Sequence, residues 1–279
     1  MTSFGDLTKA MKHYVQIFTL FFLQAIKVEL AYRMQVFQRF FGIAVSMSAT
    51  TFFWFAVSKV SPFGGYSTAM MLCYFVVVSL QDFVFISGDE FSKKLGEKIR
   101  LGKLSAALVQ PFPYLLNVFG AGLGGFAMRI CIVIPLAVFA KLTFLKEFHF
   151  QDPYFQIGMY GLAFILAIAI SLVCLIMTGL LAFDMTQVWA PWILFVASYL
   201  LLSGIFYPAD QAGATMQAIM AWTPFYYIQG FPTLILIGRL NAPQILSGFL
   251  KGTLVLGYLI LLLTLMWRRG VKKFEAVGI

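Results

Sequence analysis

Charged residues are scarce in this chain of 279 residues. Asp, Glu, Lys and Arg make up 11% of it, whereas hydrophobic residues make up 61% and aromatic residues 17%. A soluble domain has about 25% charged residues, and it could not bury this much apolar surface in one core. The lack of long polar or low-complexity segments also excludes disordered and fibrous proteins. The composition indicates a polytopic membrane protein.

Residues that could form a catalytic or metal site are equally few. The only two histidines, His13 and His149, lie far apart and on opposite sides of the predicted membrane. Cys73, Cys131 and Cys174 lie in apolar runs without paired spacing, so we expect neither a disulfide nor a metal site. The chain also has no P-loop pattern, which excludes nucleotide hydrolysis by that route. We therefore expect a non-catalytic chain that binds no cofactor or metal of its own.

The basic residues outnumber the acidic ones and give a net charge of +9. No face rich in Arg and Lys exists apart from the flanks of the apolar segments, so we expect no nucleic-acid partner. Basic residues beside membrane spans instead fix the orientation of those spans.

Residues 1–33 form neither a signal peptide nor a span, because glutamines interrupt the apolar stretch and no cleavage site follows it. On a helical projection the polar residues share one arc: Lys9, Lys12, His13, Gln16, Gln24 and Lys27. Apolar residues such as Phe18, Phe21 and Phe22 occupy the opposite arc. This pattern predicts an amphipathic helix that lies in the membrane interface and contacts lipid.

Six segments are long and apolar enough to cross the membrane as helices, which predicts an all-α fold. They are residues 40–58, 66–87, 114–140, 154–183, 188–207 and 246–267. A seventh candidate, residues 216–238, contains Pro224, Gly230 and Pro232. A lipid-facing helix broken so often would expose unsatisfied backbone groups. We therefore expect a short helical hairpin in the outer leaflet, within an extracytoplasmic segment at 208–244.

The positive-inside rule supports six spans with both termini in the cytoplasm. In this arrangement most Lys and Arg residues lie inside, including the C-terminal group Arg268, Arg269, Lys272 and Lys273. A seventh span would move that group to the outside. No loop is long enough for a separate domain, and we find no internal repeat, so we expect one transmembrane domain over residues 1–279.

Arg129 is the one basic residue deep inside a predicted span. A cation at that depth is costly, so it should face protein, a water-filled cavity or a lipid headgroup. Structural pairing with a carbonyl or with an acid such as Asp82 is the interpretation we favour. Contact with an anionic substrate or lipid, which would place both residues in a substrate pathway, and snorkelling are the alternatives. The neighbouring glycines at 120–125 are typical of close helix packing.

The predicted inside loop at 88–113 has mixed charges, with pairs such as Glu90 and Lys94 spaced for contact on a helix. The charged residues that we single out as a possible partner contact are Asp89, Glu90, Lys93, Lys94, Glu97, Lys98 and Arg100. A solvated cap is the simpler interpretation, and a short helix that inserts into a cleft on a cytoplasmic partner is the alternative. The other inside turn, at 182–191, offers Asp184, Thr186 and Gln187 as a second contact.

Three stretches carry a resemblance to a known family. Residues 99–115 look like the passage from a coupling helix to the third span of the ABC type 2 permeases, which are transmembrane subunits of ABC exporters. The matching residues there are Gly102, Leu104, Ser105 and Pro111. Residues 221–238 are similar to the outer hairpin of that family, at Trp222, Pro224, Phe231 and Pro232. The C-terminal residues 267–279 resemble the ending of its uncharacterised branch, at Trp267, Gly270, Phe274, Glu275 and Gly278.

The resemblance implies a permease subunit that receives force from cytoplasmic ABC ATPase subunits, which would use ATP and Mg²⁺. The partners would dock on the 88–103 loop, and a second permease, identical or related, would complete the pathway, with the spans 66–87 and 188–207 at the midline. The resemblance further implies a prokaryotic cytoplasmic (inner) membrane protein that exports an amphiphilic or lipid-like substrate. The turn at 182–191 is shorter than is usual in this family, which leaves its contact open.

Other classes fit the residues less well. A secondary transporter would normally need ionisable coupling residues near the midplane, and only Arg129 qualifies. A membrane-embedded enzyme that modifies lipids could grip a phosphate with Arg129, but the spans lack a nucleophile–base pair or an acid cluster. An ABC importer would carry a characteristic loop with the sequence EAA, and the only similar pair, Glu275 and Ala276, follows the last span.

Overall fold

The computed structural model describes residues 4–60, 64–86, 89–185 and 189–274. This part of the chain contains α-helices and two short 3₁₀ helices, and no strand. Six of its helices are long and apolar enough to cross a membrane: α1 (Phe4–Ala31), α2 (Arg33–Val60), α3 (Thr68–Ile86), α6 (Tyr114–Thr143), α7 (Pro153–Leu180) and α12 (Ala242–Lys273). The expected all-α polytopic membrane fold with six candidate spans is confirmed.

The six candidate spans are not the six that we expected from the sequence: α1 is included among them, and α8 (Trp189–Leu202) is not. α8, expected as a span over 188–207, has only 14 residues. At 1.5 Å per residue it is about 21 Å long, less than the ~30 Å of the hydrocarbon layer. The chain leaves the helix at Ser203 and Gly204, both buried, and Gly204 adopts a φ of +89°. Irregular backbone at this depth is tolerated because protein surrounds it.

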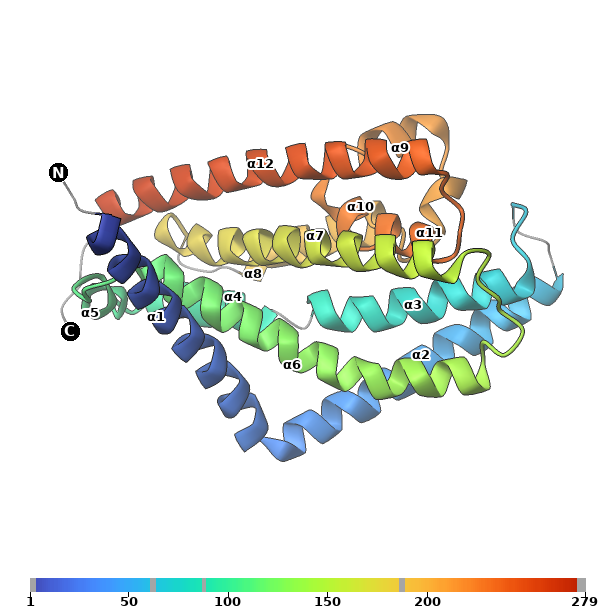
Figure 1. Ribbon diagram of the computed structural model, residues 1–279, viewed down its shortest axis with the longest axis horizontal. Helices are drawn as coiled ribbons and strands as arrows, with labels where there is room; N and C mark the ends of the chain where they lie inside the picture. The colour runs from blue at the N-terminus through green and yellow to red at the C-terminus, as the bar shows by residue number, and fades with distance from the viewer. Residues whose placement is uncertain (1–3, 61–63, 87–88, 186–188, 275–279) are drawn as a thin grey trace.

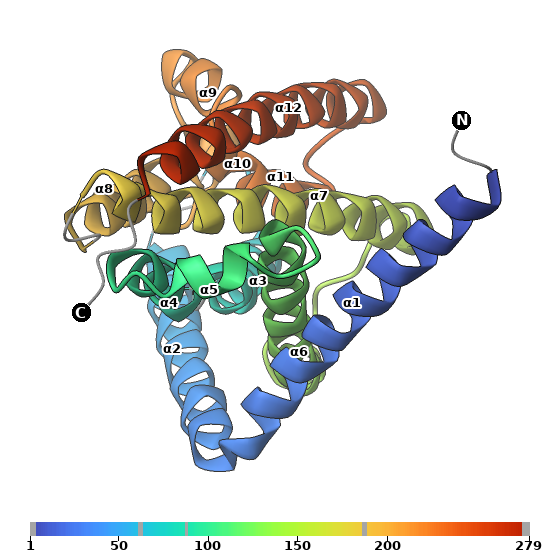
Figure 2. The same ribbon diagram turned by 90° about the vertical axis from the view of Figure 1, so that its left-hand side faces the viewer.

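The other difference concerns α1, which we expected to lie in the interface. By length and composition its residues Lys12–Ala31 are also sufficient for a span. Figures 1 and 2 show α1 running obliquely across α6, at a steep angle to the long axes of α6, α7 and α12. The interfacial placement of α1 stays a prediction.

α7 is the central helix and contacts α4 (Asp89–Arg100), α10 (Pro224–Ile228), α11 (Gly230–Leu236) and α12. It begins at Pro153, where the side chain of Asp152 accepts a hydrogen bond from the backbone N–H of Phe155 at 3.2 Å. Its small residues Ala163 and Ala167 are fully buried, so neighbouring helices approach closely. α7 therefore contacts both α4 and the short helices α10 and α11.

The segment at 208–244 forms η2 (Ala209–Gln211), α9 (Ala214–Met220), α10 and α11. α10 and α11 are short, and the residues from Tyr227 to Ile235 are buried among α3, α7 and α12. Gly248 of α12 faces this hairpin so closely that a Cβ atom there would lie 2.1 Å from the ring of Phe231. Pro224 begins α10, Pro232 is buried in α11, and Trp222 lies exposed just before α10.

α4, α5 (Leu104–Leu108) and the ends of α1 and α12 nearest the chain termini gather at one end of the bundle. α9 lies toward the opposite end (Figure 1). The two ends of the described chain therefore lie on the same side as the loop that we singled out as a partner contact.

Candidate functional site

α4 is a short amphipathic helix that lies against the end of α7 and against η1 (Leu181–Phe183). Ser92, Leu95 and Ile99 recur with helical spacing and are all buried, whereas the opposite face is charged. The side-chain oxygens of Ser92 and Thr178 lie 2.7 Å apart in a hydrogen bond between the two helices. α4 is thus attached to α7 by an apolar face and by a buried polar contact.

Gly179 makes this close approach possible. A Cβ atom at this position would lie 2.9 Å from Cδ2 of Leu95 and 3.0 Å from the backbone oxygen of Ser92. Real Cβ atoms essentially never come closer than 3.0 Å to another heavy atom. Even a Cβ atom at this position would require the Leu95 side chain to move and the backbone of Ser92 to shift by a few tenths of an ångström.

The charged residues that the sequence singled out form the outer face of α4, which we call the α4 crest. Its exposed members are Lys93, Lys94, Glu97, Lys98 and Arg100. Asp89 and Glu90 are the first residues of the helix, where the helix dipole stabilises acidic side chains. The side chains of these two residues lie outside the described part of the structure. The structure thus places these polar side chains on a firmly attached helix, with Lys93, Glu97 and Arg100 on the flank toward α8 and Lys94 and Lys98 on the flank toward α6.

The second predicted contact lies beside the first, because η1 follows α7 directly. Asp184, which is exposed, pairs with Lys273 of α12 at 2.7 Å. Phe183 packs against Gly270, where a Cβ atom would lie 2.1 Å from its ring. Thr186 and Gln187 lie outside the described residues.

A groove of about 370 Å³ separates α4 from the start of α8. Lys93 and Arg100 lie on its α4 wall, and Trp189 and Trp192 form its α8 wall. Trp189 is 65% exposed. Sequence reasoning missed these tryptophans, although their spacing of one helical turn directly after the second inside turn was a usable signal.

Arg129 and Asp82, the two candidate pathway residues, lie in different surroundings. The Arg129 side chain is 9% exposed, lies over the ring of Phe126 at 4.6 Å and lines a cavity beneath α1 and α4. Asp82 instead accepts a hydrogen bond from the hydroxyl of Tyr199 at 3.2 Å. Asp82 is not among the residues that line the Arg129 cavity, so the structure does not bring these two together.

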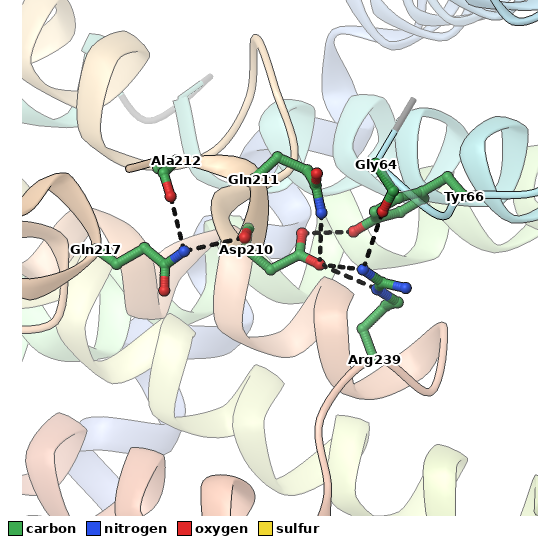
Figure 3. A network of polar contacts seen from close by, with 7 residues as sticks. All are labelled: Gly64, Tyr66, Asp210, Gln211, Ala212, Gln217 and Arg239. Carbon is green, nitrogen blue, oxygen red and sulfur yellow. Dashed lines mark hydrogen bonds and ion pairs between the residues drawn. The ribbon is translucent and has the colours of Figure 1, made fainter. Parts of the chain in front are cut away.

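A second polar cluster, at the other end of the bundle, was not anticipated from the sequence. Figure 3 shows Asp210 at its centre. The carboxylate accepts hydrogen bonds from Tyr66 at 2.6 Å and from Nε of Arg239 at 3.0 Å, and the Arg239 guanidinium lies 4.5 Å from the Tyr66 ring. Burial, followed by the hydrogen bond to Asp210, raises the pKa of Tyr66 and keeps its hydroxyl a neutral donor.

These contacts join three loops. Tyr66 precedes α3, Asp210 lies in η2, and Arg239 lies between α11 and α12. Gln217 of α9 adds hydrogen bonds to the backbone oxygens of Asp210 and Ala212, at 2.9 and 2.8 Å. We call the set of Tyr66, Asp210 and Arg239 the outer clasp. It fixes the hairpin at 208–244 to the rest of the bundle.

Among the residues that the structure describes, no three His, Cys, Asp or Glu side chains lie close enough together to hold a metal ion. The two polar features of the described residues are the α4 crest, attached to the central helix, and the outer clasp at the opposite end.

Among protein-family models, one described as an ABC-2 family transporter protein matches the chain over residues 44–278. No curated protein and no solved structure matches the chain. The matched range contains α4, η1, the hairpin and most of the spans, and it begins within α2, so it does not include α1. Because the match covers well over half of the chain, this multi-pass membrane protein belongs to the ABC-2 transporter family.

Proposed function

We propose that the chain is the permease subunit of an ATP-binding cassette exporter, powered by a separate ATPase subunit that docks on the α4 crest. The family supports a transport subunit that associates with an ABC ATPase. ATP and Mg²⁺ would be bound by the ATPase, and this chain would form the pathway without catalysing a reaction.

The attachment of α4 to α7 is the observation that carries this proposal. A helix that only capped the membrane surface would not need to be packed tightly against a membrane helix. α4 is packed against α7 by the contact of Leu95 with Gly179 and by the Ser92–Thr178 hydrogen bond. α7 in turn contacts α10, α11 and α12. A push on the α4 crest would therefore move the central helix, and α7 would carry that movement to the outer hairpin.

The groove between α4 and α8 adds a second surface for the same partner. Its α4 wall carries Lys93 and Arg100, and its α8 wall carries two tryptophans. Aromatic and Arg side chains are enriched where proteins bind one another. We propose that a polar, partly acidic segment of the ATPase enters this groove, with Asp184 near its edge.

The same proposal sets the orientation. The end with α4, α5 and the last turn of α12 would face the cytoplasm, because Lys and Arg concentrate there. Both termini would then be cytoplasmic, in the inner membrane of a prokaryote, and the outer clasp would face outward.

A second permease subunit, identical or related, would pack along α8. The α8 side chains Ile193, Leu194 and Leu201 are apolar and exposed, although α8 is too short to cross the bilayer alone. Residues Met71–Val78 of α3, which the sequence also placed at the midline, are buried within the subunit. α8 is therefore the element that supports this pairing, and the exported substrate would be amphiphilic, in keeping with apolar, aromatic spans of low charge.

Proximity cross-linking tests the docking. In a background without native cysteines, a Glu97→Cys chain is co-expressed with its ABC ATPase and treated with a bifunctional thiol reagent. We expect cross-linking between the two subunits. A Lys146→Cys chain, with its cysteine in the exposed loop after α6, is the matched control and should give none. Equal yields from the two positions, or none from Glu97→Cys in an assembled complex, would overturn the proposal.

A further inference from the structure

A cavity of about 600 Å³ lies at the end of the bundle opposite α4, between α9, the hairpin and the first turns of α12. α9 lines it with Ala214, Gln217 and Ala218. The outer clasp residues Asp210 and Arg239 also belong to its lining. A concave site of this size can hold the polar part of a small molecule.

α12 turns a stripe of small and polar residues toward this cavity. Its lining residues Gln244, Ser247, Gly248 and Lys251 recur at intervals of three and four, so they share one face of the helix. Leu246 and Leu250 lie on the other side of α12 and are 73% and 65% exposed. Polar residues within a membrane helix face protein or a water-filled cavity rather than lipid. The stripe thus gives α12 a polar side at the cavity and an apolar side away from it.

The lining contains two cations, and only one of them is paired. Arg239 lies 2.9 Å from Asp210, the one acid in the lining, in an ion pair. Lys251, which is half-buried, forms no ion pair or hydrogen bond with any residue that the structure describes. The charges of Arg239 and Asp210 cancel, so the lining keeps one positive charge, that of Lys251.

Neutral donors share the lining with this charge. The hydroxyl groups of Tyr226 and Ser247 make no hydrogen bond within the described part of the chain. The side-chain oxygen of Gln244 accepts a hydrogen bond from the backbone N–H of Asn241 at 2.9 Å, which leaves the amide nitrogen of Gln244 as a donor. An ammonium group forms a strong, charge-assisted hydrogen bond with an anionic oxygen, and hydroxyl and amide groups add to it. This set of groups suits a ligand group with a single negative charge.

The remaining surface of the cavity favours an amphiphile over a soluble ion. Met220, Leu234 and Leu240 add apolar side chains to the lining. An inorganic anion would gain nothing from these contacts, whereas a molecule with an apolar tail would bury part of its surface there. The tail could then extend along the exposed leucines of α12, with the head beside Lys251.

We propose that this cavity binds the singly charged anionic head group of an amphiphile, with Lys251 as the counter-ion and Tyr226 and Ser247 as neutral donors. The proposal adds a charge class to the amphiphile that the chain would export, and to that extent it rests on the proposed function. The binding is measured on the chain without its ATPase. A negative result would therefore leave the docking of the ATPase on the α4 crest untouched.

Protection of a cysteine in the cavity wall tests this binding. The full chain, in a background without native cysteines and with Ala218→Cys in α9, is placed in nanodiscs of dioleoyl phosphatidylcholine. Its reaction rate with a membrane-impermeant maleimide is measured while oleoyl lysophosphatidylglycerol, which carries one negative charge, is added. We expect the reaction to slow at least fivefold at saturation. Oleoyl lysophosphatidylcholine, which has the same chain and no net charge, should require at least tenfold more for the same effect.

Matched variants locate the binding. Thr215 is exposed on α9 but does not line the cavity, so the reaction rate of a Thr215→Cys chain should not change. Lys251→Gln, made in the Ala218→Cys chain, should need about tenfold more anionic lysolipid for half protection, because a charge-assisted hydrogen bond is lost. Tyr226→Phe, which removes only a hydroxyl group, should need about threefold more. Lys146→Gln removes a cation from the exposed loop after α6 and should need the same amount as the unchanged residue.

Four results would overturn the proposal. The two lysolipids could protect equally, or the Thr215→Cys chain could be protected as strongly as the Ala218→Cys chain. Lys251→Gln could need no more anionic lysolipid than Lys146→Gln does. Glycerol 3-phosphate could also protect Ala218→Cys at comparable concentration, which would identify the cavity as a site for a soluble phosphate ester.

Discussion

The hydroxyl groups of Ser92 and Thr178 lie 2.7 Å apart and connect the inner face of α4 to the end of α7. The Thr178 hydroxyl also donates a hydrogen bond to the backbone oxygen of Leu175 at 2.9 Å, so the contact is anchored in the α7 helix itself. We therefore expect α4 and α7 to move as one rigid lever.

A rigid lever should tolerate a covalent bond at this point. In a background without Cys73, Cys131 and Cys174, the Ser92→Cys/Thr178→Cys chain is oxidised in the complex with its ATPase. We expect the ATP turnover of the complex to stay within about twofold of the reduced form, because α4 and α7 move together. A large, reversible loss of turnover on oxidation would mean that α4 must slide over α7.

The opposite intervention separates the two helices. Gly179→Val would place a branched side chain against Leu95 and the backbone of Ser92, where even a Cβ atom has no room. We expect ATP turnover of the complex to fall at least fivefold while the chain remains folded. Gly161→Val is the matched control on the same helix, since a Cβ atom there meets nothing within 4 Å, and it should leave turnover unchanged. Similar effects of the two variants would contradict the role of Gly179 in holding α4 against α7.

The outer clasp should contribute to stability, because its ion pair is largely shielded from solvent. The side chains of Arg239 and Asp210 are 26% and 20% exposed. We expect Asp210→Asn to lower the free energy of unfolding by about 1–2 kcal/mol, the range for a hydrogen-bonded charge that is partly screened. Thermal unfolding in detergent measures it.

An exposed ion pair provides the comparison. Asp184 and Lys273 are 61% and 67% exposed, so Asp184→Asn should change stability by less than about 0.5 kcal/mol. If the two variants destabilise the chain equally, the clasp is no stronger than a surface pair.

The hairpin depends on a glycine in α12. Gly248→Val would drive a side chain into the ring of Phe231, and overpacking of this kind costs about 1–3 kcal/mol. Gly257→Val, on the same helix, meets nothing within 4 Å and carries the same change in helix propensity. We expect a clear fall in the unfolding temperature for the first variant relative to the second, and equal temperatures would argue against close packing of α12 on the hairpin.

Some of this architecture follows from sequence alone. Apolar length and composition are local properties, so the long helices and the break in the chain around Gly230 were visible without a structure. α8 was misjudged because hydropathy continues past Leu202, whereas Gly204, buried beside Tyr74, takes the chain out of the helix. An apolar run shows that a segment can be buried, but it does not show whether lipid or protein buries it.

The candidate site was predictable only in part. The charges of α4 were evident, but their attachment to α7 depends on Gly179, which no local pattern connects to Leu95. The outer clasp joins residues far apart in sequence, since 144 positions separate Tyr66 from Asp210. We expected Arg129 to pair with a carbonyl or with an acid such as Asp82; the structure places it beside Phe126, in a cavity whose described lining does not include Asp82.

The most direct test of the account is the ATP turnover of the complex after the α4 crest is reversed in charge. The Lys93→Glu/Arg100→Glu chain and a Lys59→Glu/Lys146→Glu control are each co-purified with the ATPase, and turnover is measured per assembled complex. The account expects turnover of the crest variant to fall to that of the ATPase alone, while the control keeps the turnover of the unchanged complex. Unchanged turnover in a fully assembled crest variant would contradict it.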